Sequence, residues 1–165
     1  MVENVISKEE RKILLKWICK NKNLFKVNPV SKNRNFLILP KVNHPNLFSD
    51  IKSRILKKEN ILENYMDEPT YRDYVGCISK GGQIHNHIDD SIIGYDHVRF
   101  NLFLSVPVQG GLPIYNGKTV KVDVGDYVRC NSSREYHSCE RVMSRIPRIV
   151  ISYGILLKQK NMSYF

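Results

Sequence analysis

The sequence predicts a mainly β fold with helices in its N-terminal part, and three observations support this prediction. Up to about residue 70, apolar residues recur at helical spacing in two segments. From Tyr71 onward, they form short runs rich in Val, Ile, Phe and Tyr, and turns such as "KGG", "QGG" and "NGK" divide these runs. Short strands separated by glycine-containing turns are typical of a β-sandwich or jelly roll rather than of alternating strands and helices.

The first 70 residues are expected to form two helices and one strand. Ser7 followed by Glu10 is a capping box, which predicts a helix from Ser7 to about Asn21. The segment "FLILP", residues 36–40, is expected to be a strand that proline ends. A second helix is expected in "HPNLFSDIKSRILKKENIL", with Pro45 near its first turn. We expect this helical layer to cover one face of a sheet.

The remainder of the chain is expected to consist of strands alone. Each predicted strand is a short apolar run next to a turn, and the runs are "YRDYVGCIS", "GQIHNHI", "HVRFNLFLSVP", "LPIY", "TVKVDV", "GDYVRCN", "YHSCERV" and "PRIVISYGILL". The 165 residues most simply form a single domain, with residues 1–70 as a helical support layer and residues 71–165 as the jelly-roll core.

Composition narrows the class of protein and its surroundings. The sequence is 42% hydrophobic and 25% charged, and no apolar run approaches the roughly 20 residues that span a bilayer. The N-terminus lacks the basic-then-apolar order of a signal peptide, so we expect an intracellular, cytoplasmic protein without a membrane partner. The four cysteines form no C-x-x-C pair and are expected to be reduced and mostly buried.

The net charge of +10 leaves the question of a nucleic-acid partner open. The positive charges are spread along the chain, and neither an arginine-rich recognition helix nor an aromatic nucleic-acid motif is present. A solvated basic surface is therefore the favoured interpretation, and a nucleic-acid partner is not favoured.

The stretch "GGQIHNHIDD", residues 81–90, holds an unusual density of potential metal ligands. Side chains two apart on a strand share a face, so His85, His87 and Asp89 would point the same way if the strand ran unbroken. A buried carboxylate without a partner is costly, and a shared metal ion offsets that cost. A further ligand must come from elsewhere, and His137 lies on a late strand that a jelly roll brings back beside its early strands.

"HNHID" and "HSCERVMSRIPRIVIS" together resemble the non-haem Fe(II)- and 2-oxoglutarate-dependent oxygenases, in particular the small prolyl-hydroxylase-like members. Their pattern is H-x-D, a distal His and an Arg about ten residues further on, and the resemblance extends over residues 74–157. It implies a double-stranded β-helix, which is a cupin-like jelly roll. It also implies that His87, Asp89 and His137 are the catalytic, iron-binding residues.

The resemblance further implies how the cosubstrate is held. Arg148 matches the residue that pairs with the far carboxylate of 2-oxoglutarate, and Ser152 on the same strand face is a supporting contact. Arg99 and Asn101 share a face and could bind the metal-bound end of the cosubstrate or the substrate, while Tyr115 could line the cavity.

The activity that the resemblance implies is dioxygenation. It would consume 2-oxoglutarate and O₂, release succinate and CO₂, and hydroxylate a C–H bond of an amino-acid or peptidyl substrate. Ascorbate as a reductant belongs to the same expectation. Because Asp89 occupies a ligand position, no site is left for a halide, and hydroxylation is favoured over halogenation.

Two other functions stay open at this point. A cupin-type dioxygenase could bind its metal through His85, His87 and His137 without 2-oxoglutarate, although that pattern has a Glu several residues after the histidine pair, which is missing here. A non-catalytic jelly roll could bind a partner through its basic surface.

The remaining polar residues of this region receive minor roles. His85 is assigned to a supporting position beside the metal or the substrate, and His97 to the surface or the cavity entrance. Asp90 is expected in solvent or a turn, and the N-terminal helices together with residues 59–71 are a hypothetical substrate lid.

Overall fold

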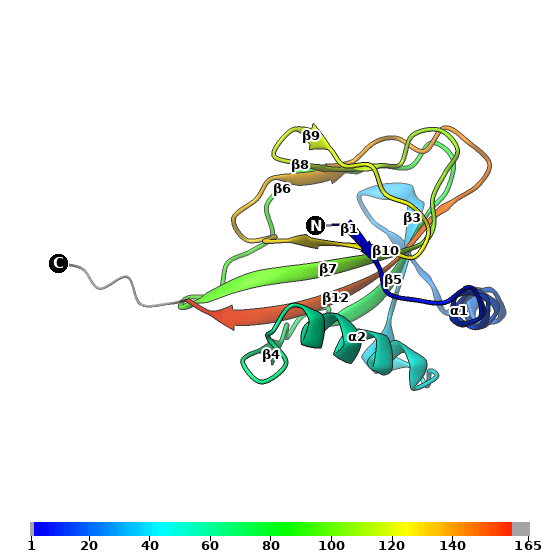
Figure 1. Ribbon diagram of the computed structural model, residues 1–165. Helices are drawn as coiled ribbons and strands as arrows, with labels where there is room; N and C mark the ends of the chain where they lie inside the picture. Colours follow the sequence, from blue (N-terminus) through cyan, green and yellow to red (C-terminus); the bar gives the residue numbers. More distant parts are fainter. Residues whose placement is uncertain (1, 160–165) are drawn as a thin grey trace.

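The structure is a computed structural model that describes residues 2–159, and it consists of two β-sheets and two α-helices (Figure 1). The α-helices are α1 (Lys8–Lys20) and α2 (Leu47–Lys58), and short 3₁₀ turns lie at Lys22–Leu24 and Leu39–Lys41. Neither α-helix of the described chain is long and apolar enough to cross a membrane.

The larger sheet is formed by strands from both ends of the chain. Its order is β1-β10-β7-β12-β5-β3-β2, with β4 also paired to β12. The strands are β1 (Val2–Asn4), β2 (Lys26–Asn28), β3 (Ser31–Ile38), β4 (Met66–Asp67), β5 (Asp73–Ile78), β7 (Tyr95–Ser105), β10 (Asp126–Cys130) and β12 (Arg148–Lys158). All of the pairings are antiparallel, and the long strands β7 and β12 lie side by side at the centre.

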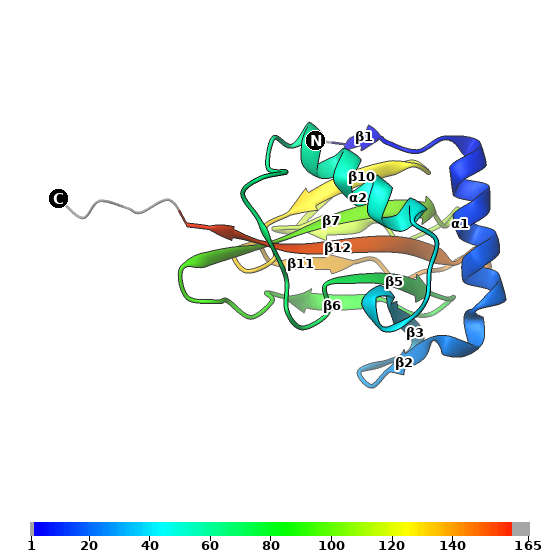
Figure 2. The same ribbon diagram turned by 90° about the horizontal axis from the view of Figure 1, so that it is seen from below.

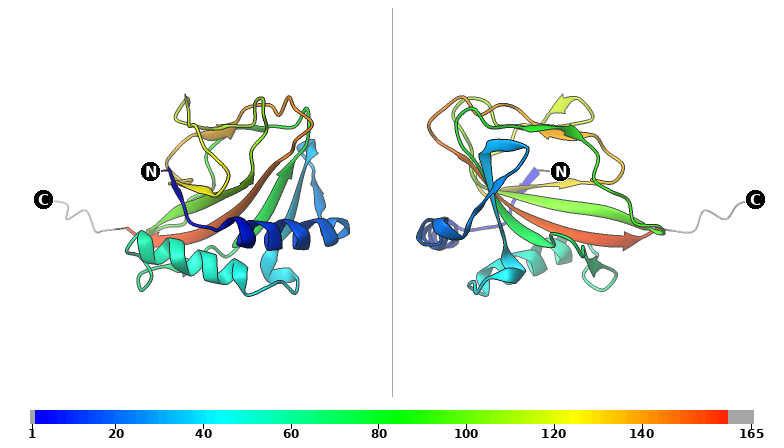
Figure 3. Two further views of the ribbon diagram at one scale, coloured as in Figure 1. Left: turned by 45° about the vertical axis from the view of Figure 1, so that its right-hand side comes forward. Right: turned by 180° about the vertical axis from the view of Figure 1, so that it is seen from behind.

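The smaller sheet lies opposite the larger one, as Figures 1 and 3 show. Its order is β6-β11-β8-β9, built from β6 (Ile84–His87), β11 (His137–Cys139), β8 (Pro113–Tyr115) and β9 (Lys118–Thr119). Residues of both sheets line a cavity of about 350 Å³ between them. This arrangement is the double-stranded β-helix that the sequence predicts.

The helices cover the outer face of the larger sheet, on the side away from the smaller sheet (Figure 2). Apolar side chains of α1 and α2 pack there against alternate residues of the central strands, and this core includes Leu14, Ile18, Phe48, Ile51, Ile55, Val98, Phe100, Ile151, Tyr153 and Ile155. Each such fully buried side chain stabilises the fold by about 1.5–3 kcal/mol. The other residues of β7 and β12 face the cavity, and they include the polar candidates for the site.

The capping box predicted at the start of α1 is confirmed. The Ser7 hydroxyl accepts a hydrogen bond from the Glu10 backbone N–H at 3.1 Å, and the Glu10 carboxylate accepts one from the Ser7 N–H at 2.8 Å. The second helix begins at Leu47, so Pro45 precedes it instead of lying within it. All four cysteines are free, and Cys19 differs from the expectation because it is exposed.

Several strands differ from the prediction. "TVKVDV" is wrong as a strand, because only Lys118–Thr119 pair and residues 120–124 run as irregular chain. Strands β1, β2 and β4 were not predicted, since two or three residues at a sheet edge leave no periodic pattern to detect. Residues 1–70 therefore contribute strands to the larger sheet in addition to the helical layer. Strand β4 and the cavity-lining Tyr71 both lie within the segment 59–71, for which a lid was expected.

Candidate metal centre

Pairing between two short strands of the smaller sheet brings His87 and His137 together. In the register of β6 and β11, His137 lies directly opposite His87, and on the other side of β11 it lies opposite Tyr115. Strand β6 ends at His87, so the strand expected through Asp89 is interrupted. Asp89 is held instead by its backbone N–H, which donates to the Ser132 carbonyl at 2.8 Å.

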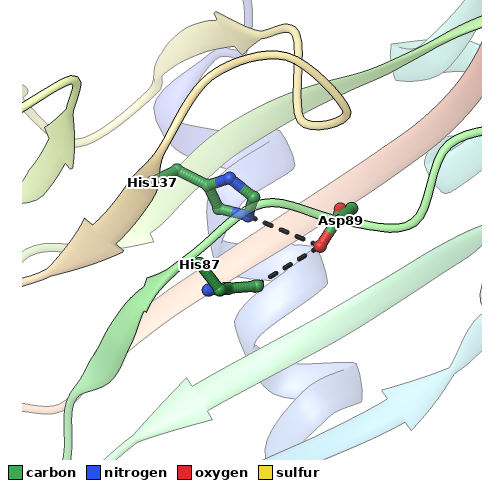
Figure 4. Close-up of side chains that lie close together, drawn as sticks. All are labelled: His87, Asp89 and His137. Carbon is green, nitrogen blue, oxygen red and sulfur yellow. Dashed lines mark ion pairs between the residues drawn. The ribbon is translucent and has the colours of Figure 1, made fainter.

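The three side chains converge on one point (Figure 4). Oδ1 of Asp89 lies 3.3 Å from Nε2 of His87 and 3.6 Å from Nε2 of His137. One ligand atom from each residue lies within 4.8 Å of the others, which is compatible with coordination of a single ion. Among the described residues, this is the group of three that could hold a metal.

Both imidazoles are oriented by the backbone. Nδ1 of His87 lies 2.8 Å from the His85 carbonyl oxygen, and Nδ1 of His137 lies 3.0 Å from the Glu135 carbonyl oxygen. A neutral ring that donates its Nδ1–H to a carbonyl keeps the Nε2 lone pair free for a metal. The backbone carbonyls thus favour the Nδ1–H tautomer of both rings. In both rings, Nε2 is the nitrogen that faces Asp89.

The charge of the centre fits a divalent cation. Burial raises the pKa of Asp89, but the adjacent His137 and His87 and the charge of Arg99 outweigh burial and hold this pKa far below its usual range. The adjacent Asp89 carboxylate raises the pKa of His87. Two imidazoles and one ionised carboxylate are the donor set of non-haem Fe(II) oxygenases, and this set leaves further coordination positions open.

The second carboxylate oxygen of Asp89 faces a buried ion-pair network. Its Oδ2 lies 3.4 Å from Nε of Arg99, whose Nη2 lies 3.0 Å from Oε2 of Glu68. Arg99 is 6% exposed, and its Nη1 also donates to the Arg72 carbonyl at 3.3 Å. With Oδ2 held in this way, Oδ1 is the Asp89 oxygen directed at the two histidines.

Arg99 and Ser152 were expected to contact the cosubstrate. In the structure, both are buried and they contact each other. Ser152 is fully buried, and its hydroxyl accepts from Arg99 at 3.5 Å. Gly154 leaves the space for this arrangement, because a Cβ at this position would lie 2.7 Å from the Arg72 carbonyl oxygen and 2.9 Å from Nη1 of Arg99. The guanidinium of Arg99 is thus engaged by protein groups, although the residue also lines the cavity.

Glu68 was not singled out in the sequence, yet it is the residue that neutralises Arg99. It is 2% exposed and accepts hydrogen bonds from the backbone N–H groups of Thr70, Tyr71 and Arg72 at 2.6–2.9 Å. No local pattern marks this role, because Glu68 lies between β4 and β5 in an irregular segment.

Arg148, Asn101 and Tyr115 are further polar residues that line the cavity, the first two from the larger sheet and Tyr115 from the smaller one. Arg148 is 6% exposed, its guanidinium lies 5.1 Å from the centre of the Phe103 ring, and its buried Nε has no hydrogen-bond partner within residues 2–159. Asn101 donates to the Tyr115 hydroxyl at 3.3 Å, and burial raises the pKa of Tyr115. A buried guanidinium donor without a partner is costly and fits an anionic ligand.

The expectation that His97 lies at the surface or entrance is wrong. His97 is 6% exposed, and its Nδ1 lies 3.7 Å from Oδ2 of Asp89. Its position on the cavity face of β7 follows from the same alternation that turns Arg99 and Asn101 inward. Within the described chain, its Nε2 has no hydrogen-bond partner.

His85 and Asp90, the two other candidates within residues 81–90, lie outside the group of ligand atoms. The His85 side chain is exposed and contacts Gln83, so the carbonyl of His85, and not its ring, supports His87. The structure therefore favours the ligand set with Asp89 over the three-histidine alternative. Asp90 is exposed at the cavity rim, as expected.

The sequence alone matches neither a protein-family model nor a curated protein. The fold, in contrast, is similar to that of several solved structures. HygX from Streptomyces hygroscopicus, solved with nickel, 2-oxoglutarate and hygromycin B, superposes with a TM-score of 0.73 at 14% identity, covering 94% of this chain and 81% of HygX. The viral collagen prolyl hydroxylase vCPH from Paramecium Bursaria Chlorella virus-1, in its 2-oxoglutarate complex, gives 0.73 at 15% identity and 96% coverage of both chains.

A prolyl hydroxylase from Trichoplax adhaerens, in complex with a hypoxia-inducible-factor peptide, gives a TM-score of 0.72 at 16% identity, covering 96% of this chain and 83% of that one. The chain thus has the double-stranded β-helix fold of the 2-oxoglutarate-dependent oxygenases.

Proposed function

We propose that this protein is an Fe(II)- and 2-oxoglutarate-dependent dioxygenase that hydroxylates a C–H bond of an amino-acid or peptidyl substrate. The observation that carries the proposal is the convergence of His87, Asp89 and His137 in one cavity that also contains the buried, partly unpaired guanidinium of Arg148. The similar structures with bound 2-oxoglutarate support this assignment.

In this proposal, His87, Asp89 and His137 hold Fe(II), with Asp89 using Oδ1. Bound Fe(II) and 2-oxoglutarate would supply the oxidising chemistry with O₂, with release of succinate and CO₂ and with ascorbate as a reductant. Arg99 keeps Oδ2 of Asp89 occupied, so that this carboxylate binds through one oxygen and leaves more of the coordination sphere open. Because Asp89 supplies a ligand, hydroxylation is favoured over halogenation.

Arg148 is proposed to bind the far carboxylate of 2-oxoglutarate. A guanidinium can meet a carboxylate with two parallel hydrogen bonds, and the unpaired Nε of Arg148 would then be satisfied. Asn101 and Tyr115 line the same cavity from opposite sheets and would add polar contacts to the cosubstrate. The packing of Arg148 against Phe103 and the burial of this region exclude water from that ion pair.

The test is an anaerobic titration with Fe(II) and 2-oxoglutarate, followed by the metal-to-ligand charge-transfer band in the visible. We expect the wild type to give the band and Asp89→Ala and His137→Ala to lose it. Arg148→Ala should keep metal binding but need a much higher 2-oxoglutarate concentration. His44→Ala is the matched control, because His44 lies outside the site and packs against Phe48. A wild type without the band, or an undiminished band in Asp89→Ala, would reject the proposal.

A further inference from the structure

A third arginine, Arg34, lines the same cavity and has no part in the metal centre described above. In the sheet register, Arg34 on β3 and Arg148 on β12 both lie opposite Ile78 on β5, one on each side of it. Directly paired residues of neighbouring strands share a face, so both arginines point from one row of the larger sheet toward the cavity. Two strand spacings separate their Cα atoms by about 10 Å.

The guanidinium of Arg34 is half-buried and unpaired. Among the hydrogen bonds and ion pairs of residues 2–159, none involves its side chain, whereas Arg99 and Arg54 both pair with glutamates. Arg34 lines the same cavity as His87, Asp89 and His137. A cation in this position can contact a ligand that lies beside the metal.

The charges of the cavity lining leave Arg34 without a counter-ion. Arg99 is matched by Glu68 and Asp89, and under the proposed function Arg148 is matched by the far carboxylate of the cosubstrate. Asp90, the remaining acid of the lining, is exposed and forms no ion pair with Arg34. Placing a half-buried guanidinium in a cavity without an anion costs free energy unless a ligand supplies one.

The rim next to Arg34 is aromatic. Phe36 lies two residues further along β3, opposite Gly76, and its ring packs edge-to-face against Tyr71 with 6.4 Å between the ring centres. The whole cavity of about 350 Å³ is at the small end of the roughly 300–1,000 Å³ that is usual for ligand pockets. Beside a five-carbon cosubstrate, it therefore suits a small second ligand with one anionic end and a short apolar part.

We propose that Arg34 binds a carboxylate of the primary substrate, so that the hydroxylated group belongs to a free carboxylic acid of amino-acid size or to a C-terminal residue, and not to an internal residue of a protein chain. This inference rests on the proposed function and adds a substrate class to it. Arg34 is a specificity-determining residue in this assignment, while Arg148 serves the cosubstrate.

The test uses the full chain loaded anaerobically with Fe(II) and 2-oxoglutarate, so that ligands bind without turnover. The probes are the free L-amino acids, their carboxamides and their N-acetyl derivatives, and the readouts are displacement of the charge-transfer band and the rise in melting temperature. We expect at least one free acid to bind and its carboxamide to bind roughly 10- to 100-fold more weakly, because the charged hydrogen bond is lost. Binding of the N-acetyl derivative would identify a C-terminal residue as the source, and its failure would identify a free amino acid.

The variant Arg34→Gln should lose the same roughly 10- to 100-fold in affinity for the acid while keeping the band and the wild-type affinity for 2-oxoglutarate. Arg145→Gln is the matched control, because Arg145 is exposed and outside the cavity lining. A normal band with unchanged acid binding in Arg34→Gln, equal binding of acids and carboxamides, or no binding of any free acid rejects the substrate site alone. Absence of the band in the wild type rejects the proposed function and the substrate site with it.

Discussion

The buried pair of Glu68 and Arg99 supports the candidate metal centre, and replacing Glu68 by Gln tests it most directly. Both oxygens of Glu68 accept hydrogen bonds, Oε1 from Thr70 at 2.6 Å and Oε2 from Tyr71 and Arg72 at 2.9 Å and from Arg99 at 3.0 Å. All four partners are donors. An amide at this position would turn its NH₂ group toward a donor and remove the charge opposite Arg99.

The expected cost follows from these contacts. Removal of one partner from a buried ion pair typically costs about 3–5 kcal/mol. We expect about 3 kcal/mol for Glu68→Gln, since the guanidinium of Arg99 keeps its contacts with Asp89 and Ser152. For a chain of this length, each 1 kcal/mol lowers the melting temperature by about 2–4 °C, so the variant should melt about 6–12 °C below the wild type.

The loss should depend on pH. Burial raises the pKa of Glu68, but the N–H groups of Thr70 and Tyr71 and the charge of Arg99 outweigh burial and bring this pKa below its ordinary value of 4.5. The unfolded chain therefore takes up a proton here at a higher pH than the folded chain. The stabilisation by the ionised Glu68 is present above pH 4.5 and is lost as the pH falls through the folded-state pKa. The melting temperatures of the wild type and of Glu68→Gln should therefore approach each other in acid.

Thermal unfolding followed by circular dichroism, at neutral pH and in steps through the acid range, measures both effects. Glu63→Gln is the matched control, because Glu63 is exposed in the segment that precedes β4. If Glu68→Gln melts within about 2 °C of the wild type at neutral pH, the pair contributes little and the reasoning is wrong. A difference that stays constant through the acid range would refute the assigned pKa direction.

Two further substitutions probe other contacts. In Gly154→Ala, the new Cβ would lie 2.7 Å from the Arg72 carbonyl oxygen and 2.9 Å from Nη1 of Arg99, so both would have to move away. Because this shifts the guanidinium that holds Asp89, Fe(II) affinity should fall about 10- to 100-fold in an anaerobic titration, while Gly76→Ala, with its nearest contact at 3.4 Å, should match the wild type. Lys52→Met removes an ammonium that lies 2.7–2.9 Å from two aspartates, so the free energy of unfolding in urea should fall by about 1.5–3 kcal/mol; a loss below about 0.5 kcal/mol would contradict this.

Much of the fold could be predicted from local patterns. The capping box of Ser7 and Glu10, the apolar face of α2 and the alternation along β7 and β12 depend on residues close in sequence, and all four elements are present in the structure. The short strands β1, β2 and β4 were missed, because each is only two or three residues long and pairs through backbone groups that do not depend on its side chains.

The sequence by itself determined which side chains could bind a metal and an anion: His87, Asp89 and His137 as potential ligands, and Arg148 as a cation on the cavity face of its strand. The tertiary structure decided which partners they meet. Strand alternation tells on which face a side chain lies, but the register of neighbouring strands decides what stands beside it. Only that register, together with the fold of irregular segments, brings Glu68 to Arg99, places His97 beside Asp89 and sets Arg34 in one row with Arg148.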